Sequence, residues 1–308
     1  MASSYTKWPK ITIVTPSYNQ GRFIEATILS ILNQEYPNLE YIIIDGGSTD
    51  ETIEILKKYD KHISYWISEK DQGQSHAIIK GLEKATGTIF NWVNSDDILE
   101  SKALFYVGKL YNKYQFDILV GTGRIVTIDH ANKPIKEELW KAKLWDFPSD
   151  FLRPYGVVLP QASTFINLET LKRIGSINKS LHYVMDWELY FRLAQEEKLK
   201  KITTDQILSQ QLIHNESKTY NFSERFSKEY VSVLKDTTKK EDISLKLQKA
   251  IFYKLKDNEW KERITHPPEK INTLFSLFIK AVLNHPNLIT QRFFWGALRN
   301  ALIKKVDE

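Results

Sequence analysis

The chain has no cysteine among its 308 residues. That absence excludes a disulfide framework, a thiolate zinc site and a cysteine nucleophile, and it suits a reducing compartment. No hydrophobic run reaches the roughly 18 apolar residues that a membrane span needs. Residues 1–10 are polar and lack the apolar core of a signal peptide. We therefore expect a cytoplasmic protein.

The remaining composition is that of a globular protein. Hydrophobic residues make up 42% of the chain, which suits a packed core and argues against wholesale disorder. The length fits one large domain or a little more. The formal net charge of +5 suits a protein that meets phosphates or acidic lipids. Because lysine and glutamate are interleaved along most of the sequence, this charge does not indicate a nucleic-acid partner.

Strand and helix patterns alternate through the first part of the sequence. Short apolar runs predict strands at 11–14, 41–44, 63–67, 88–93 and 118–120. Apolar residues at helical spacing predict helices at 23–32, 48–59, 74–84 and 101–114. Ser48 and Glu51 have the spacing of a capping box for the second of these helices. The alternation predicts an α/β fold with a mostly parallel sheet and helices on both faces.

Polar clusters follow several of the predicted strands, at 15–18, 45–47, 69–74 and 94–97. Open α/β sheets bind ligands beyond the carboxyl ends of their strands, so we expect these clusters to meet at one site. The last cluster contains Asp96 and Asp97. One or two carboxylates with substrate phosphates are how proteins usually hold Mg²⁺. The alternative for these paired acids is a solvated turn.

The second part of the chain has a weaker pattern. Residues 121–124 superficially resemble a phosphate loop but lack its Lys-Ser/Thr, so we predict a turn there. We expect an irregular, aromatic-lined segment at about 127–158, a helix at 185–193 and a short strand at 201–203. After Tyr220 the chain is helical and charged, with a candidate boundary at 235–242.

The polar clusters, taken with two later segments, resemble motifs of the family 2 glycosyltransferases. The similar segments are 14–19, 41–50, 94–97, 160–165 and 182–189. Their order and spacing resemble a bacterial, non-processive branch of the family over roughly residues 10–215. The resemblance implies the A-type (GT-A) nucleotide-sugar-binding fold. It implies a catalytic domain at 1–220, with a donor-binding half at about 10–125 and an acceptor-binding half at about 126–220, followed by a helical C-terminal region at 221–308.

The resemblance also implies how a nucleotide-sugar donor would be bound. The base and ribose would meet Thr15, Pro16, Tyr18 and Asp45, and a carboxylate at Asp45 suits the imide N–H of uracil. The alternative for Asp45 is a turn residue that bonds its own backbone.

Further donor contacts are implied at the phosphates and the sugar. Asp71 and Gln74 precede a predicted helix whose backbone N–H groups could face the phosphates or the sugar, the alternative being a simple helix cap. Asn94 and Asp96 complete the donor set.

A divalent cation, Mn²⁺ or Mg²⁺, is the implied cofactor. The resemblance makes Asp97 its direct ligand, with Asp96 touching the ribose or donor sugar or reaching the metal through water. His214 is implied as a metal or diphosphate contact, against the alternative of a lone surface histidine. The metal would bridge both phosphates and act as a Lewis acid and template.

Asp186 is the implied general base. An acceptor hydroxyl that attacks an anomeric carbon must lose its proton, and a carboxylate in a partly apolar pocket can take it. Met185 and Trp187 could supply that pocket, and Glu188 is the second choice. Gln161 and Trp187 are implied acceptor contacts, and Gln161 has the alternative of holding the Asp186 helix. The family's chemistry inverts the anomeric centre by single displacement.

The resulting expectation is an inverting, metal-dependent enzyme of surface polysaccharide assembly. It would move one sugar from a nucleoside-diphosphate sugar, UDP-linked by preference, to a saccharide or polyprenyl-linked acceptor. The Gln-x-x-Arg-Trp motif of processive synthases is not matched at 291–295. A sugar nucleotidyltransferase is an alternative, but 15–19 is not the Gly-rich basic loop that such an enzyme needs. An inactive nucleotide-sugar-binding scaffold is the third interpretation.

The segment 271–306 has apolar positions at helical spacing beside several cations. We expect a helical pair that packs on the catalytic domain or on the second subunit of a homodimer. The alternative is peripheral docking at the inner face of the membrane, where an apolar face and a cationic rim are needed.

Overall fold

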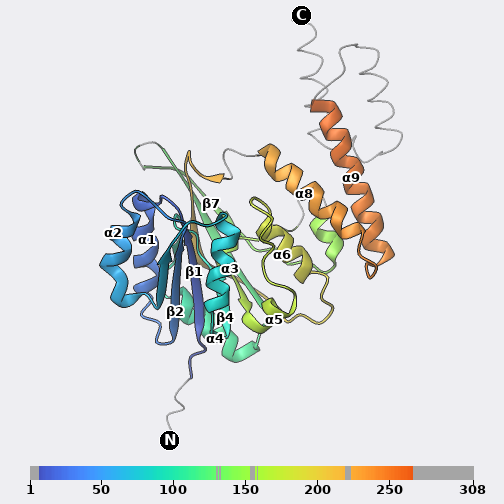
Figure 1. Cartoon of the computed structure of the whole chain (residues 1–308). Coiled ribbons are helices and arrows are strands. Elements are labelled where there is room, and N and C mark those ends of the chain that lie inside the picture. The colour runs from blue at the N-terminus through green and yellow to red at the C-terminus, as the bar shows by residue number, and fades with distance from the viewer. Residues whose placement is uncertain are drawn as a thin grey trace, which may run out of the picture. The chain divides into compact units, whose positions relative to one another are not determined.

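The computed structural model (Figure 1) describes residues 7–129, 131, 133–152, 157, 159–218 and 223–265. The described chain divides into two compact units between Tyr230 and Val231. The second unit contains the end of α8 (Ser223–Thr238) and α9 (Leu245–Thr265), which confirms that the chain is helical and charged there. The predicted helical pair at 271–306 lies outside the described residues.

The first unit is built on a sheet that has nine strands in the described part of the chain, in the order β3-β2-β1-β4-β8-β6-β9-β5, with β7 paired to β6. The strands are β1 (Ile11–Ser17), β2 (Leu39–Asp45), β3 (Tyr65–Ser68), β4 (Ile89–Trp92), β5 (Ile98–Leu99), β6 (Ile118–Ile128), β7 (Pro134–Trp140), β8 (Thr164–Asn167) and β9 (Lys201–Ile213). The helices are α1 (Gly21–Leu32), α2 (Thr52–Tyr59), α3 (Gln74–Lys84), α4 (Ala103–Tyr114), α5 (Leu168–Arg173) and α6 (Met185–Leu193).

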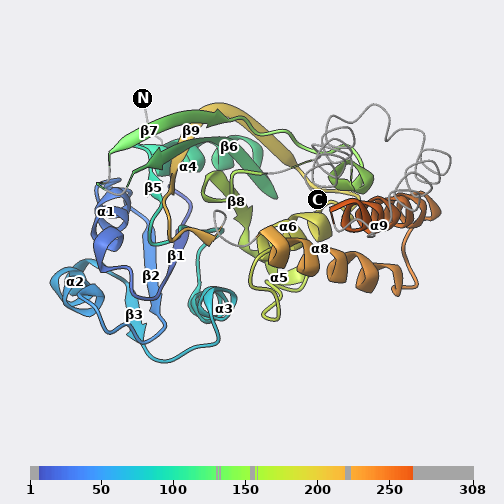
Figure 2. The same ribbon diagram turned by 90° about the horizontal axis from the view of Figure 1, so that it is seen from above.

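Helices cover both faces of the parallel half of the sheet, which consists of β3, β2, β1 and β4 (Figures 1 and 2). Ile11 and Ile13 of β1 face a core that includes side chains of α1 and α4. Val14 faces the other way, against Gly81 of α3. Successive residues of a strand point to opposite faces, so a strand that is apolar at every position needs cover on both. The predicted α/β fold class is confirmed.

The sheet continues where the sequence predicted a turn. Residues 121–124 lie inside β6, and the predicted turn is wrong. A side chain at Gly121 would collide with Leu208, and a Cβ at Gly123 would lie 2.7 Å from the Cβ of Pro160. These glycines therefore mark close approach of neighbouring segments within a strand, one of the established uses of strand glycine.

Two other strands differ from their predictions in extent. The strand expected at 201–203 is β9, which runs from Lys201 to Ile213 and pairs along β6. Within the segment expected to be irregular, β7 pairs antiparallel with β6. Both extensions depend on pairing with β6, which the local pattern of each segment does not reveal.

The predicted capping box is wrong. Helix α2 begins at Thr52, and its N-cap residue, Glu51, makes no side-chain capping bond. Ser48 instead donates its hydroxyl to Oδ1 of Asp45 at 2.5 Å. The Ser48 hydroxyl is thus used to close the turn after β2, and it is not available to the helix.

A buried carboxylate network at the amino end of the sheet gives a stability prediction. Glu40 accepts from Lys10 Nζ at 2.6 Å, from Thr12 Oγ1 at 2.6 Å and from the backbone N–H of Thr86 at 2.8 Å. Burial raises the pKa of Glu40, but these hydrogen bonds outweigh it and lower the pKa from 4.5 to about 2. The ionised carboxylate therefore stabilises the folded state at neutral pH.

Glu40→Gln is expected to lower the free energy of unfolding by about 2 kcal/mol at neutral pH, because it removes charge-assisted hydrogen bonds. A group with a depressed folded pKa contributes stability above its unfolded pKa and loses it as the pH falls through the folded value. The gap between wild type and variant should therefore narrow as pH falls from 4.5 toward about 2. Urea unfolding across this range is the measurement, and a gap that is independent of pH would contradict the assignment.

Candidate active site

The predicted convergence of polar clusters is confirmed. A cavity of about 690 Å³ is lined by residues that follow β1, β2, β3 and β4 and by parts of β6, β9 and α6. Ten of the predicted site residues line it: Pro16, Tyr18, Asp71, Gln74, Asn94, Asp96, Asp97, Gln161, Asp186 and His214.

Three predicted site residues do not line the cavity. Thr15 is fully buried, with its hydroxyl 3.2 Å from the hydroxyl of Tyr41. Trp187 stacks on Phe191 at 5.0 Å between ring centroids and meets Tyr230 edge-on at 4.5 Å. These packing roles account for the two side chains without any ligand. Asp45 is the third.

Asp45 is fully buried at the end of β2. Its carboxylate accepts from the backbone N–H groups of Gly47 and Ser48, and from the hydroxyls of Ser48 and Ser68, at 2.5–3.0 Å. Four donors occupy its two oxygens, which is the geometry of the turn residue that was the alternative interpretation. The uracil contact implied for Asp45 is therefore not offered by this arrangement.

A different carboxylate, that of Asp71, lies beside the residue that follows Asp45, and it lines the cavity. A Cβ at Gly46 would lie 3.2 Å from the Asp71 carboxyl group and would push that group aside by a few tenths of an ångström. Asp71 also accepts from the backbone N–H of Gly73 at 2.7 Å. The absence of a side chain at 46 thus gives Asp71 its place beside the cavity.

Ser17 and Gln20 are lining residues that sequence reasoning missed. Ser17 Oγ and Gln20 Oε1 are buried atoms without a hydrogen-bond partner in the described part of the chain. Buried polar atoms are normally paired, so atoms left unpaired at a cavity wall are suited to a polar ligand. Ser17 ends β1 and belongs to the predicted polar cluster at 15–18, although it was not named as a site residue, and Gln20 follows three residues later. Position near the end of the strand was the only available signal. We call Ser17, Tyr18, Gln20 and Asp71 the Ser17 end of the cavity.

Asp96 and Asp97 form the acidic centre of the cavity. Asp97 is 3% exposed, and it accepts from Asn94 Nδ2 at 3.0 Å and from the backbone N–H of Leu212 at 3.4 Å. Burial raises the pKa of Asp97, and the neighbouring charge of Asp96 raises it further. A buried carboxylate beside a second carboxylate favours a cation, which would offset both the burial of Asp97 and the repulsion from Asp96.

His214 belongs to the acidic centre through Asp96. Its Nε2 lies 3.2 Å from Asp96 Oδ2, and its ring lies 4.4 Å from that of Phe23. At 6% exposure it is not the lone surface histidine of the alternative interpretation. Within the described ranges, no group of three or more His, Asp or Glu side chains is arranged to hold a metal. Two carboxylates with substrate phosphates suffice for Mg²⁺, so Asp96 and Asp97 fit such an ion.

Asp186 lies in the first turn of α6 and faces the cavity. Its carboxylate accepts from the backbone N–H of Trp187 at 2.7 Å, and burial raises its pKa. Glu188 is buried and paired with Arg192 at 2.7 Å, so its carboxylate is already engaged. Of these two acids, Asp186 is therefore the one suited to accept a proton from a ligand.

The loop before α6 is held by Glu229 of α8. Its carboxylate accepts from the backbone N–H groups of His182, Tyr183 and Val184 at 2.7–3.2 Å. Val184 is the N-cap residue of α6 and the other two residues directly precede it, so this carboxylate fixes the backbone that leads into the helix. The position of Asp186 in the next turn follows from this arrangement.

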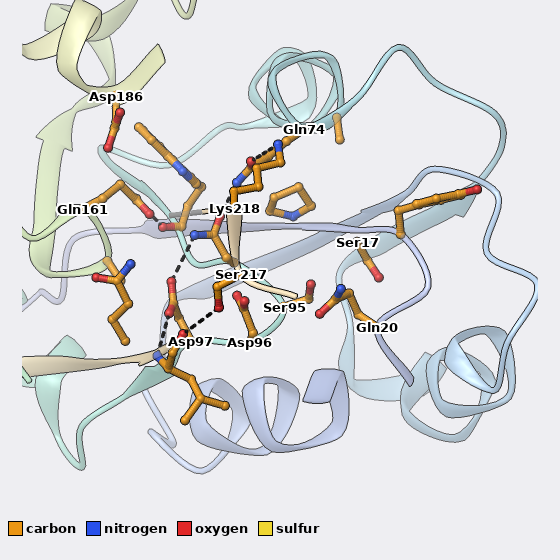
Figure 3. Close-up of a pocket in the computed structure, with 18 of the residues that line it drawn as sticks. Ser17, Gln20, Gln74, Ser95, Asp96, Asp97, Gln161, Asp186, Ser217 and Lys218 are labelled. Carbon is orange, nitrogen blue, oxygen red and sulfur yellow. Dashed lines mark hydrogen bonds between the residues drawn. The ribbon is translucent and has the colours of Figure 1, made fainter. Parts of the chain in front are cut away.

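Gln161 is held against strand β4. It donates to the carbonyl of Trp92 at 2.7 Å, while its Oε1 has no partner in the described part of the chain. Figure 3 shows Gln161 and Asp186 on one side of the cavity, which we call the Asp186 end, and Ser17 and Gln20 on the other. The acidic centre lies between them.

Comparison with known proteins identifies the family. Residues 12–172 match the family described as glycosyl transferase family 2. The chain belongs to this family. The resemblance seen in the sequence is thereby confirmed.

Curated relatives carry glycosyltransferase names. An uncharacterized glycosyltransferase of Rickettsia typhi is 25% identical over 77% of this chain and 76% of its own length. The putative teichuronic acid biosynthesis glycosyltransferase TuaG of Bacillus subtilis is 41% identical over 30% of this chain and 38% of its own. An uncharacterized Haemophilus influenzae glycosyltransferase is 40% identical over 31% of this chain and 40% of its own. The match to these last two relatives thus spans less than half of their length.

Solved structures share the GT-A fold. S. aureus TarS 1-349 in complex with UDP-GlcNAc superposes with a TM-score of 0.62 at 15% identity, covering 87% of this chain and 79% of that one. The mannosyltransferase PcManGT of Pyrobaculum calidifontis, in complex with GDP-Man and Mn²⁺, gives a TM-score of 0.53 at 16% identity, covering 97% of this chain and 88% of that one.

None of the helices in the described part of the chain is long and apolar enough to cross a membrane.

Proposed function

We propose that this chain is an inverting glycosyltransferase that moves one sugar from a nucleoside-diphosphate sugar to an acceptor hydroxyl. The observation that carries the proposal is the placement of Asp186, with its raised pKa, in the same cavity as the acidic centre. A base and a site for a cation that would offset the charge of the diphosphate, both in one cavity, suit a displacement at an anomeric carbon. The names of TuaG and TarS support a role in surface polysaccharide assembly.

The acceptor hydroxyl is the nucleophile in this proposal. The Asp186 carboxylate takes its proton as the oxygen attacks the anomeric carbon, and the bond from that carbon to the diphosphate oxygen breaks. The bonding pair leaves with the nucleoside diphosphate, and attack from the opposite face inverts the anomeric centre. Burial favours proton uptake by Asp186, because it disfavours the charged carboxylate.

The acidic centre is the place for a divalent cation, Mn²⁺ or Mg²⁺. Asp97 and Asp96 would hold it, and it would supply charge neutralisation at the donor's diphosphate. His214 lies 3.2 Å from Asp96 Oδ2, and it would hold that carboxylate in place. The Mn²⁺ in the PcManGT complex is consistent with this assignment.

The donor would extend from the acidic centre to the Ser17 end. Pro16, Tyr18, Asp71, Gln74 and Asn94 are the proposed contacts, all of which line the cavity. The sugar would be a hexosyl or N-acetylhexosaminyl group, in line with the GDP-Man and UDP-GlcNAc of the structural neighbours. The acceptor, a saccharide or a lipid-linked saccharide, would lie at the Asp186 end against Gln161.

The full-length protein, incubated with a panel of UDP- and GDP-sugars and Mn²⁺, is expected to release nucleoside diphosphate slowly by transfer to water. Phosphate-sensitive detection after nucleotide hydrolysis measures the release. Formation of a nucleotide sugar from a sugar phosphate and a nucleoside triphosphate would instead identify a nucleotidyltransferase. Tight donor binding without turnover, even with saccharide acceptors added, would identify an inactive scaffold.

A further inference from the structure

A directional chain of hydrogen bonds crosses the middle of the cavity (Figure 3). Lys218 Nζ donates to Gln74 Oε1 at 2.9 Å, and Gln74 Nε2 donates to Asn94 Oδ1 at 2.7 Å. Asn94 Nδ2 then donates to Asp97 Oδ2 at 3.0 Å. Asn94 turns its amide nitrogen to Asp97 and its amide oxygen to Gln74. Gln74 in the same way turns its amide oxygen to the Lys218 ammonium.

The Lys218 ammonium has one donor to spare. It also donates to the carbonyl of His182 at 3.3 Å and lies 6.0 Å from the centre of the Tyr183 ring, and no third hydrogen-bond acceptor is found among the described residues. An ammonium carries three N–H donors, so one is left for a ligand in the cavity that Lys218 lines. Gln74 and His182 come from neighbouring segments, since a Cβ at Gly73 would lie 3.3 Å from Nδ1 of His182. Together they hold the partly exposed Lys218 side chain beside the cavity that it lines.

The electrostatic setting of Lys218 suits an anion. Desolvation by the surrounding protein lowers its pKa, while the charges of Glu229, Asp96 and Asp71 raise it and partly compensate. A partly desolvated cation interacts more strongly with an anionic ligand than a hydrated one does. Two hydrogen bonds already hold the ammonium without a ligand, which reduces the cost of ordering it on binding.

Other lining cations are placed differently. Arg124 is paired with Glu100 at 3.1 Å and also with Glu137. The backbone of Lys70 lies next to Gly47 in the loop after β3, at the Ser17 end. Lys218 is therefore the lining lysine that the hydrogen-bond chain connects to the acidic centre.

We propose that Lys218 donates its remaining N–H to the diphosphate of the bound nucleotide sugar and stabilises the nucleoside diphosphate as it leaves. This role rests on the proposed function. Charge develops on the diphosphate as its bond to the sugar breaks, and a preorganised cation at that position acts on the transition state. Lys218 would thus share with the divalent cation the task of binding the leaving group.

The test is calorimetric titration of UDP, GDP, UMP and GMP into the full-length protein, with Mg²⁺ and separately with a chelator. Lys218→Met keeps the length of the side chain and removes its charge, and Lys218→Arg keeps the charge. Lys228→Met is the matched control, because Lys228 is a 71% exposed lysine of α8 paired with Glu224. Thermal melting of each variant checks the fold.

Lys218→Met is expected to weaken diphosphate binding about 10- to 100-fold, the range for a lost hydrogen bond to a charged group. Monophosphate binding should change little, Lys218→Arg should retain part of the affinity, and Lys228→Met should match wild type. In the chelator, wild type should keep weak diphosphate binding that Lys218→Met lacks. An unchanged ratio of diphosphate to monophosphate affinity in a folded Lys218→Met protein would overturn the role of Lys218 alone. Failure of wild type to bind any of the four nucleotides would overturn the proposed function as well.

Discussion

Asp186→Asn is expected to lower the rate of sugar transfer by about 10²- to 10⁴-fold, the usual effect of removing a general base. Donor affinity should stay close to that of wild type, because Asp186 lies at the opposite end of the cavity from Ser17 and Gln20. Asparagine has the same shape and can still accept from the backbone N–H of Trp187, as the aspartate does at 2.7 Å. The substitution therefore removes the proton acceptor and little else.

Transfer rates and donor dissociation constants should be measured on the same preparations. Asp205→Asn is the matched control, since Asp205 is exposed on β9 and does not line the cavity. If Asp186→Asn turns over within a few-fold of wild type, another group takes the proton and the assignment fails. Loss of donor binding together with turnover would indicate a structural role for Asp186.

The same assignment predicts a pH dependence. Burial raises the pKa of Asp186, so its carboxylate is protonated at a higher pH than that of an exposed aspartate. The wild-type transfer rate should therefore rise with pH through this raised value, because only the ionised form accepts a proton. The residual rate of Asp186→Asn should lack that rise. The measurement is the transfer rate of wild type and of Asp186→Asn as a function of pH at saturating donor, which shows whether the rise depends on Asp186.

Asp97→Asn is expected to abolish metal-dependent binding of nucleoside diphosphate and, with it, turnover. Asn94 Nδ2 donates to Oδ2 at 3.0 Å and the Leu212 N–H donates to Oδ1 at 3.4 Å, so the single amide oxygen of asparagine keeps an acceptor for only one of these two donors. The substitution also removes the negative charge that a divalent cation needs. Burial and Asp96 both raise the pKa of Asp97, so its charge is unfavourable in the metal-free fold. Loss of this charge should offset the hydrogen bond that the amide cannot accept, so the variant should be about as stable to heat as wild type when no metal is present.

Titration of Mn²⁺ into protein saturated with UDP or GDP is the measurement for Asp97. Asp97→Ala should lose the metal equally, but it leaves the two donors without an acceptor and should melt at a lower temperature. Asp205→Asn again serves as the control. Wild-type metal affinity in a folded Asp97→Asn protein would show that the ion is held elsewhere.

Local pattern was sufficient for the parallel half of the sheet. The apolar runs at 11–14 and 41–44 form β1 and β2, because a strand buried on both faces must be apolar throughout. The carboxyl ends of parallel strands share one edge, which is why the polar clusters after them could be expected to meet at one site. Gln161, Asp186 and His214, which lie outside those clusters, were named from the family resemblance. The resemblance to family 2 glycosyltransferases followed from the same strand ends.

The second half of the sheet was predicted less well. Residues 121–124 have the composition of a turn, and only the approach of Leu208 and Pro160 shows why glycine is needed inside β6. Strand β9 is 13 residues long because it pairs along β6, a partner distant in sequence. Hydrogen bonding between remote strands overrides the preferences of a short segment.

By itself the sequence determined the alternation of strands and helices, the family and the acids of the centre, since each depends on neighbouring residues or on a known motif. Tertiary structure alone decided which side chains reach the cavity. In the folded chain the Asp45 carboxylate accepts hydrogen bonds within its own turn and does not line the cavity. The Asp71 carboxylate lies beside Gly46 and does line it. Tertiary structure also brought Lys218 to Gln74 across 144 positions of the chain. A hydrogen bond over such a separation depends on the path of every element between its partners, and no local pattern records that path.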